Sequence, residues 1–187
     1  GEFSLVNAWF ESVSGFTTTG SSILTDVEAL PRGLQFWRFS STWIGGMGVV
    51  MFALLILPSL GRSKMTLSNV ELSSMAKDNY RYRTQMIVQV LLVVYVGLTV
   101  LSTLLLKMAG MNWFDALCHA MSACATSGFS TKNASISFYN SPAIDTILIL
   151  VMAIAGMHFG LIYATVTGKR SNLFRSEVTR FYVGMLL

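Results

Sequence analysis

Two short stretches rich in threonine, serine and glycine contain the residues best suited to chemistry in this chain. The first reads SGFTTTGS over residues 14–21, and the second reads ATSGFS over residues 125–130. Each follows an apolar run too short to cross a bilayer and precedes one long enough to cross it. Non-helical backbone is tolerated at membrane depth only where protein buries it or where it lines a watery path. The carbonyl and hydroxyl oxygens of such loops can replace the hydration shell of a cation, so we expect cation coordination here.

The composition is typical of a polytopic membrane protein. Of the 187 residues, 53% are hydrophobic and only 12% are charged, and the mean hydropathy of +0.59 is too high for an ordinary soluble domain. The basic residues flank the apolar segments instead of forming a stripe, so nucleic acid is not expected as a partner. Cys118 and Cys124 lie six residues apart in one predicted helix, which favours neither a disulfide nor a metal site.

The hydropathy pattern predicts two short helices and three membrane spans. The short helices, at 4–14 and 113–124, are about half the length needed to cross a bilayer. We expect the spans at 34–57, 84–106 and 144–166, separated by polar loops. The first span contains Gly45-Gly46-Met47-Gly48, which favours close packing of a second helix over a moving hinge.

The two loops belong to an internal repeat. A shift of 108 residues places Ser14 on Ser122, Thr18 on Thr126, Gly20 on Gly128 and Ser22 on Ser130. The order of these identities and the matching hydropathy predict duplicated units. We divide the chain into a first unit at 1–60 that lacks its first helix, a loop at 61–83, a complete unit at 84–168 and a link at 169–187. The chain starts with glycine and stops inside an apolar run, which predicts an excised fragment.

The basic residues predict the orientation in the membrane. Nine of the thirteen Lys and Arg residues lie in 61–83 or after the last span, so we expect 61–83 and 168–180 to be cytoplasmic. Both Thr/Gly loops then open outward. Each short helix points its C-terminus toward the membrane centre, where a partial negative charge of about half an elementary unit favours cations.

The same stretches resemble the Trk/Ktr/HKT superfamily of potassium uptake proteins, in particular the bacterial Trk-type membrane subunit. The resemblance covers nearly the whole chain. Family members place four repeats around one pore, and each repeat has a helix, a pore helix, a filter loop and a second helix. This chain resembles the first two of those repeats. The segments that carry the resemblance are SGFTTTGSS, LPRGLQFWR, STWIGGMGV, ILPSLG, FDALCHAMSACATSGFSTKNAS and SPAIDTILILVMAIAGMHFGL.

The resemblance implies an all-α membrane protein of the potassium-channel-like kind, with no catalytic residues and no cofactor. It implies potassium uptake across the bacterial plasma membrane through a pore with four inequivalent filter loops. Gly20 implies a preference for potassium over sodium. The implied filter residues are Thr17, Thr18, Thr19, Gly20 and Ser21 in the first loop, and Ala125, Thr126, Ser127, Gly128 and Phe129 in the second.

Backbone carbonyls are expected to hold the transported ion, chiefly those of Thr18, Thr19, Thr126 and Ser127. The resemblance also implies a homodimer surrounded by membrane lipid. A cytosolic nucleotide-binding regulatory subunit is implied as a further partner, in contact with the inner loops 61–83 and 168–180.

Several polar and aromatic residues have more than one reading. Glu11 and His119 are equivalent in the repeat, and we expect hydrogen-bonded anchors of the filter loops rather than direct ion ligands. We expect Arg38 to extend outward to the interface rather than act as an electrostatic gate. His158 is expected to be a packed polar residue rather than a metal ligand. The residues of the predicted outer aromatic belt are Phe36, Trp37, Phe39 and Trp43.

The main alternative function is a secondary solute or cation symporter with discontinuous helices. Such a protein also places short helix ends near the bilayer midplane, which explains the repeat but not two outward-facing Thr/Gly loops. An intramembrane enzyme needs a nucleophile together with a base or a metal set, and the Ser, His and Asp residues here form no such motif.

Overall fold

The computed structural model describes residues 4–65, 74–157 and 177–186, and all regular structure within these ranges is helical. This confirms the expected all-α fold for the described part of the chain. The helices are α1 (Leu5–Phe16), α2 (Arg32–Met65), α3 (Ser74–Met108), α4 (Trp113–Cys124), the 3-10 helix η1 (Ser135–Tyr139), α5 (Pro142–Ala155) and α7 (Glu177–Leu186).

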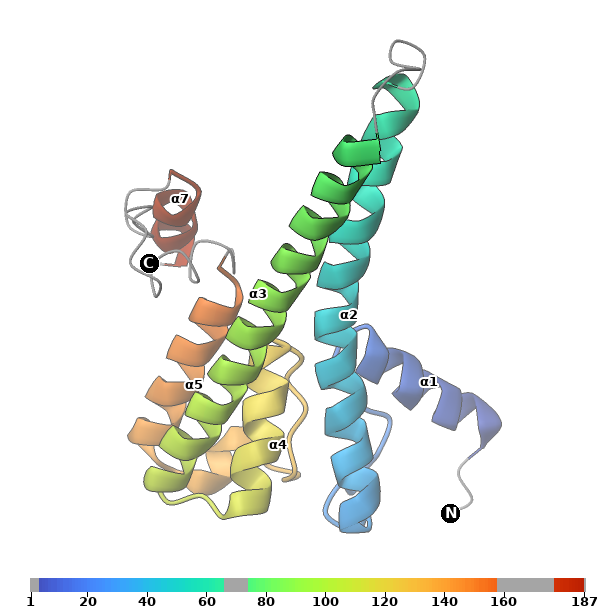
Figure 1. Cartoon of the computed structure of the whole chain (residues 1–187). Helices are drawn as coiled ribbons and strands as arrows, with labels where there is room; N and C mark the ends of the chain where they lie inside the picture. The colour runs from blue at the N-terminus through green and yellow to red at the C-terminus, as the bar shows by residue number, and fades with distance from the viewer. Residues whose placement is uncertain (1–3, 66–73, 158–176, 187) are drawn as a thin grey trace.

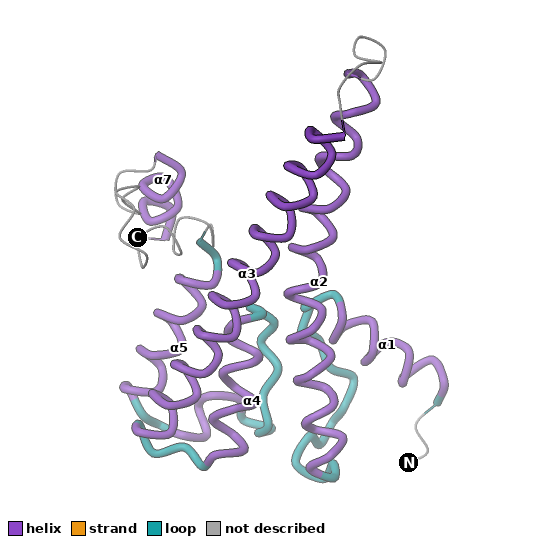
Figure 2. Tube along the Cα trace, in the orientation of Figure 1, coloured by secondary structure: helices purple, strands orange, loops and turns teal. Residues whose placement is uncertain are grey.

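The long helices α2 and α3 form the frame on which the short helices are placed. They lie side by side near the end at which α2 leads into α3, and they diverge toward their other ends, where α4 packs against both, as Figure 1 shows. The short helix α1 packs against α2, whereas α4 packs against α2, α3 and α5. After both α1 and α4 the chain reverses direction, and the returning segment runs beside α2 in the first case and beside α4 in the second (Figure 2). Ser14 of α1 and Ser122 of α4 each hold the returning loop by a hydrogen bond. The two short helices and their following loops are therefore built in the same way.

The two short helices share their length and their capping positions. Each has 12 residues, and each begins after a polar cap, Ser4 for α1 and Asn112 for α4, which lie 108 positions apart. The Ser4 hydroxyl accepts the Asn7 N–H at 3.3 Å, and the Asn112 side chain accepts the Asp115 N–H at 2.9 Å. Each bond satisfies a backbone donor that the first turn of a helix leaves free.

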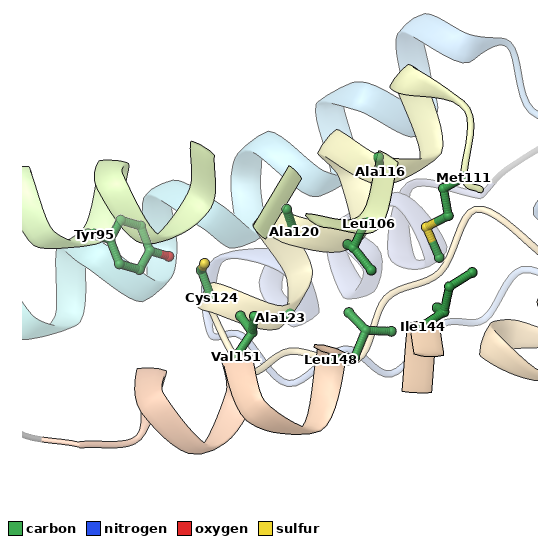
Figure 3. Close-up of a cluster of buried hydrophobic side chains, with 10 residues drawn as sticks. All are labelled: Tyr95, Leu106, Met111, Ala116, Ala120, Ala123, Cys124, Ile144, Leu148 and Val151. Carbon is green, nitrogen blue, oxygen red and sulfur yellow. The ribbon is translucent and has the colours of Figure 1, made fainter. Parts of the chain in front are cut away.

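Small residues bring the helices into close contact. A Cβ atom on Gly45 of α2 would lie 2.2 Å from the Phe16 carbonyl oxygen, and one on Gly46 would lie 2.9 Å from the Tyr95 hydroxyl. At Gly45 and Gly46 the structure agrees with the packing role expected of this glycine-rich stretch, and α2 continues without interruption through it. Around α4, alanines likewise allow close contact between helices, in the buried cluster between α3 and α5 (Figure 3). The cluster comprises Tyr95, Leu106, Met111, Ala116, Ala120, Ala123, Cys124, Ile144, Leu148 and Val151.

The long helices extend beyond the predicted spans. Among the described residues, Leu91–Met108 is the segment that is long and apolar enough to cross a membrane, and Pro142–Ala155 is a shorter apolar helix. The expectation of a loop throughout 61–83 is wrong, because α2 continues to Met65 and α3 begins at Ser74. Lys, Arg and Glu are good helix formers, so a polar sequence alone does not end a helix.

Helix α5 ends earlier than the predicted span. Its last residue is Ala155, and the Tyr182 hydroxyl of α7 donates a hydrogen bond to the Ala153 carbonyl at 3.1 Å. This contact satisfies one of the carbonyls that the end of a helix leaves without a partner. The rest of the predicted span, with His158, lies outside the described residues, as does much of 168–180.

Candidate functional site

Both short helices end in the same backbone motif. After α1, the Thr18 N–H donates to the Gly15 carbonyl at 2.9 Å and the Thr19 N–H donates to the Ser14 carbonyl at 3.0 Å. After α4, Thr126 donates to Ala123 at 3.1 Å and Ser127 donates to Ser122 at 3.0 Å. These pairs form the Schellman motif, which terminates a helix with one left-handed residue.

The left-handed residue is a threonine in both loops. The φ angle is 54° at Thr18 and 52° at Thr126, and positive values recur at Gly20 (72°) and Gly128 (90°). Glycine is the usual residue at the left-handed position of this motif, and a β-branched residue there is strained by about 1–3 kcal/mol. Successive carbonyls of an ordinary strand point to opposite sides. Positive φ at alternate residues rotates every second peptide plane, so that neighbouring carbonyls can face the same side.

A serine on each short helix holds the far end of its loop. The Ser14 hydroxyl donates to the Ser21 carbonyl at 2.6 Å, and the equivalent Ser122 hydroxyl donates to the Phe129 carbonyl at 2.9 Å. The carbonyls of Ser21 and Phe129 are therefore turned toward the helices. Side-chain bonds also occupy the Thr17 hydroxyl, which donates to the Val13 carbonyl at 2.7 Å.

The carbonyls between these points lack protein donors. Within the described part of the chain, no hydrogen bond to the carbonyls of residues 17–20 or 125–128 is present. In the first row Thr17 and Thr19 are exposed and Thr18 and Gly20 are half-buried, whereas in the second row Ala125 and Ser127 are buried and Thr126 and Gly128 are exposed. Most of these residues are therefore accessible to water or to an ion, either of which can take the place of a protein donor. The structure therefore brings together most of the predicted filter oxygens as unpaired acceptors.

Glu11 and His119 occupy equivalent positions behind the two loops. A Glu11 carboxylate oxygen accepts the Ser22 hydroxyl at 2.6 Å and the Ile23 N–H at 2.7 Å. The His119 Nε2 lies 3.0 Å from the Ser130 hydroxyl. Because His119 Nδ1 lies 2.8 Å from the Asp115 carbonyl, Nδ1 holds the proton and Nε2 accepts from Ser130. Both side chains thus bind the serine that follows their loop.

Arg38 does not extend outward to the interface, so that prediction is wrong. Its side chain is buried, and its Nε lies 3.2 Å from a Glu11 carboxylate oxygen. The ion pair draws the guanidinium inward, because a buried carboxylate needs a partner. The predicted aromatic belt is also wrong in part. Phe36 and Trp37 are exposed, but Phe39 is fully buried between His119 and Phe129.

Trp43 also departs from the predicted belt, because it is engaged inside the helical frame. Its indole N–H donates to the Thr99 hydroxyl at 3.0 Å, and its ring lies 5.3 Å from that of Tyr95. Trp43 therefore joins α2 to α3.

The two loops touch each other at Gly20. A Cβ atom on this residue would lie 1.7 Å from the Ser127 carbonyl oxygen, a separation that real Cβ atoms do not reach. Gly20 thus meets two demands at once, a positive φ and direct contact with the backbone of the other loop. The sequence indicated the first demand but gave no signal for the second.

A second link between the units was missed by sequence reasoning. The Asn133 side chain accepts the Val27 N–H at 2.7 Å and donates to Asp26 at 2.8 Å, and the Asn133 N–H donates to Glu28 at 3.1 Å. The hydrogen bond from Asn133 lowers the pKa of Asp26. Lys132 adds an ion pair to Glu28 at 3.4 Å. No local pattern relates residues that are more than a hundred positions apart.

Comparison with known proteins identifies the family to which the chain belongs. Residues 2–180 match the family described as TrkH, cation transport protein. The chain belongs to the TrkH family. It is 38% identical over 185 residues to the Trk system potassium uptake protein TrkH of Salmonella typhimurium, a match that covers 98% of the chain and 38% of that protein. It is 32% identical over 180 residues to TrkG of Escherichia coli K12, covering 95% of the chain and 37% of that protein.

A solved TrkH structure has the same fold. The crystal structure of the potassium transporter TrkH from Vibrio parahaemolyticus matches with a TM-score of 0.79 and 29% identity, over 96% of the chain and 36% of that structure. The chain thus spans about 38% of the length of the curated TrkH relatives. These matches confirm the family resemblance and the all-α repeat fold, and TrkH membership places the chain in the membrane.

Proposed function

We propose that the two loops form part of a potassium uptake pore and that the backbone carbonyls of Thr18, Thr19, Thr126 and Ser127 coordinate the ion. The observation that supports this most directly is the pair of equivalent carbonyl rows without protein donors. Carbonyl oxygens in such rows can replace the hydration shell of a potassium ion. The TrkH and TrkG relatives are named as potassium uptake proteins, which favours potassium as the cargo.

Helix electrostatics supports the same proposal. Both loops begin at the C-terminus of a short helix, where the peptide dipoles sum to a partial negative charge. A cation near that end is stabilised, and an anion is not. The two helices therefore favour positive charge at the loops before any side chain contributes.

The other predicted filter residues have positioning roles in this proposal. Ser21 and Phe129 fix the outer ends of the loops through their bonds to Ser14 and Ser122. Gly20 and Gly128 supply the positive φ angles that only glycine adopts without strain. We assign ion contact to the carbonyl rows and not to the hydroxyls of Thr17 and Thr19, because these two hydroxyls lie 2.8 Å apart and bind each other.

The orientation and the partners extend the proposal. The loops face outward, and the basic segments 61–83 and 168–180 face the cytoplasm, as the distribution of Lys and Arg predicts. The protein acts as a homodimer with a cytosolic nucleotide-binding regulatory subunit at those segments. This part of the proposal is supported by the family resemblance alone.

Ion uptake in a host that lacks its own potassium uptake tests the proposal. Expressed there in the protein that contains this chain, Gly20→Ser is expected to weaken the discrimination of potassium over sodium, because the new side chain meets the Ser127 carbonyl. Gly33→Ser is the matched control, since nothing lies within 4 Å of a Cβ at that position. Unchanged selectivity in Gly20→Ser, or an equal loss in Gly33→Ser, contradicts the proposal.

A further inference from the structure

Arg38 makes three different contacts with one guanidinium group. Its Nε lies 3.2 Å from a Glu11 carboxylate oxygen, and its Nη2 donates to the Ser22 hydroxyl at 3.1 Å. The face of the group lies 4.3 Å from the centre of the Phe129 ring. The residue is 9% exposed, so these contacts are shielded from water and screening is weak.

These contacts join the two loops. Ser22 follows the first loop directly, and Glu11 holds both Ser22 and the Ile23 N–H. Phe129 belongs to the second loop, where its carbonyl is bound by the Ser122 hydroxyl. A displacement of the Arg38 side chain therefore disturbs both loops, whereas a displacement of His119 acts on the second loop only.

The charged pair has no counterpart in the second unit. The position equivalent to Glu11 is His119. In the span after the loop a shift of 110 aligns Gly46 with Gly156, and it places Arg38 on Leu148, an apolar residue of the buried cluster. The second loop is thus held from its own unit by neutral groups.

From the first unit, the second loop is contacted by the Arg38 cation and the Phe39 ring at Phe129 and by Gly20 at the Ser127 carbonyl. Of the two side chains among these contacts, the cation is the one that also binds the residues that hold the first loop.

We propose that Arg38 is a positioning residue that sets the two filter loops relative to each other and so contributes to ion selectivity. The inference rests on the proposed potassium pathway. The geometry requires arginine, because its planar guanidinium contacts a carboxylate, a hydroxyl and a ring face at the same time. The small ammonium group of lysine cannot make all three contacts at once. The Nη1 of Arg38 has no hydrogen-bond partner among the described residues, so the position of the group depends on the other three contacts.

Two conservative variants test this inference, Arg38→Lys and Phe129→Leu, alone and together. Each is expected to lower the potassium-to-sodium uptake ratio about threefold or more, because Phe129→Leu removes the ring from the contact and a lysine at position 38 cannot hold Glu11, Ser22 and the ring together. The double variant is expected to lose no more than the more affected single variant, since both changes break the same link between the loops. The ratio does not depend on the amount of folded protein, which scales both fluxes equally, so a purely structural role leaves it unchanged.

Arg32→Lys is the matched control. Arg32 is on the same helix and also lies over a ring, 5.7 Å from the centre of Phe114, but it is exposed and does not contact the loops. Its replacement is expected to leave the uptake ratio unchanged. If Arg38→Lys does not reach the membrane, Phe129→Leu alone decides the outcome.

Three results overturn the inference: an unchanged ratio in Phe129→Leu, additive losses in the double variant, or an equal loss in Arg32→Lys. The wild-type measurement separates this inference from the proposed function. A wild-type protein without potassium preference contradicts the proposed function itself. A selective wild type with equally selective variants contradicts only the role of Arg38.

Discussion

Removal of one charge from the Glu11–Arg38 pair is expected to destabilise the protein more than removal of both. The two side chains are only 9% and 10% exposed, so little solvent screens a charge that has lost its partner. Glu11→Gln keeps an oxygen that can accept from Ser22 and Ile23 but leaves the Arg38 cation without a counter-charge. Arg38→Met leaves the Glu11 carboxylate with its two other donors.

The magnitudes follow from these remaining contacts. Loss of one partner of a buried ion pair costs about 3–5 kcal/mol. We expect Glu11→Gln to reach this range, because Arg38 then keeps only the Ser22 hydroxyl and the Phe129 ring. Arg38→Met is expected to cost about 2–3 kcal/mol, since charge-assisted hydrogen bonds still hold the carboxylate. The double variant buries no charge and is expected to cost less than about 2 kcal/mol.

Thermal unfolding of the purified protein in detergent measures these differences. In the longer protein that contains this chain, Glu11→Gln is expected to lower Tm by on the order of 5 °C. The control is Glu28→Gln, which breaks an ion pair whose Glu side chain is 40% exposed and is expected to cost less than about 1 kcal/mol. Additive losses in the double variant, or a Glu11→Gln loss no larger than that of Glu28→Gln, refute the reasoning.

Two further predictions concern the loops and the helix packing. Ser14→Ala and Ser122→Ala each remove a hydroxyl that holds a loop carbonyl. Each variant is therefore expected to lower the potassium-to-sodium uptake ratio about fivefold. Replacement of either serine by threonine is the control, because threonine keeps the hydroxyl and is expected to keep most of the selectivity. If both alanine variants keep the potassium-to-sodium uptake ratio of the wild type, the role of these hydroxyls in selectivity is contradicted. Gly45→Ala places a Cβ atom 2.2 Å from the Phe16 carbonyl oxygen, so this variant is expected to lose about 1–3 kcal/mol of stability. Gly48→Ala is the control, because its Cβ atom meets open space and the change is expected to be neutral or stabilising. Equal Tm values for these two glycine variants speak against the close packing of α1 on α2.

The repeat register accounts for most of what could be predicted from the sequence. The identities that align Ser14 with Ser122 and Ser22 with Ser130 mark residues that make equivalent hydrogen bonds in the structure. Such bonds depend on positions within about twelve residues of one another. Local sequence therefore contains enough information to place them.

The features that sequence reasoning missed depend on distant partners or on strain. Arg38 is near the start of a helix, where an outward position is the ordinary expectation, but its carboxylate partner comes from another helix 27 positions earlier. Asn133 contacts residues 26–28, more than a hundred positions away. The left-handed threonines were not foreseen either, because glycine is the usual residue at that position.

An experimental structure of the protein containing this chain, with thallium ions as an anomalously scattering substitute for potassium, tests the central claim most directly. We expect anomalous density in contact with the backbone carbonyls of Thr18 and Thr19 in the first loop and of Thr126 and Ser127 in the second. Density placed at other residues, or loops whose carbonyls are turned away from the ion, contradicts the claim that these carbonyls form the potassium site.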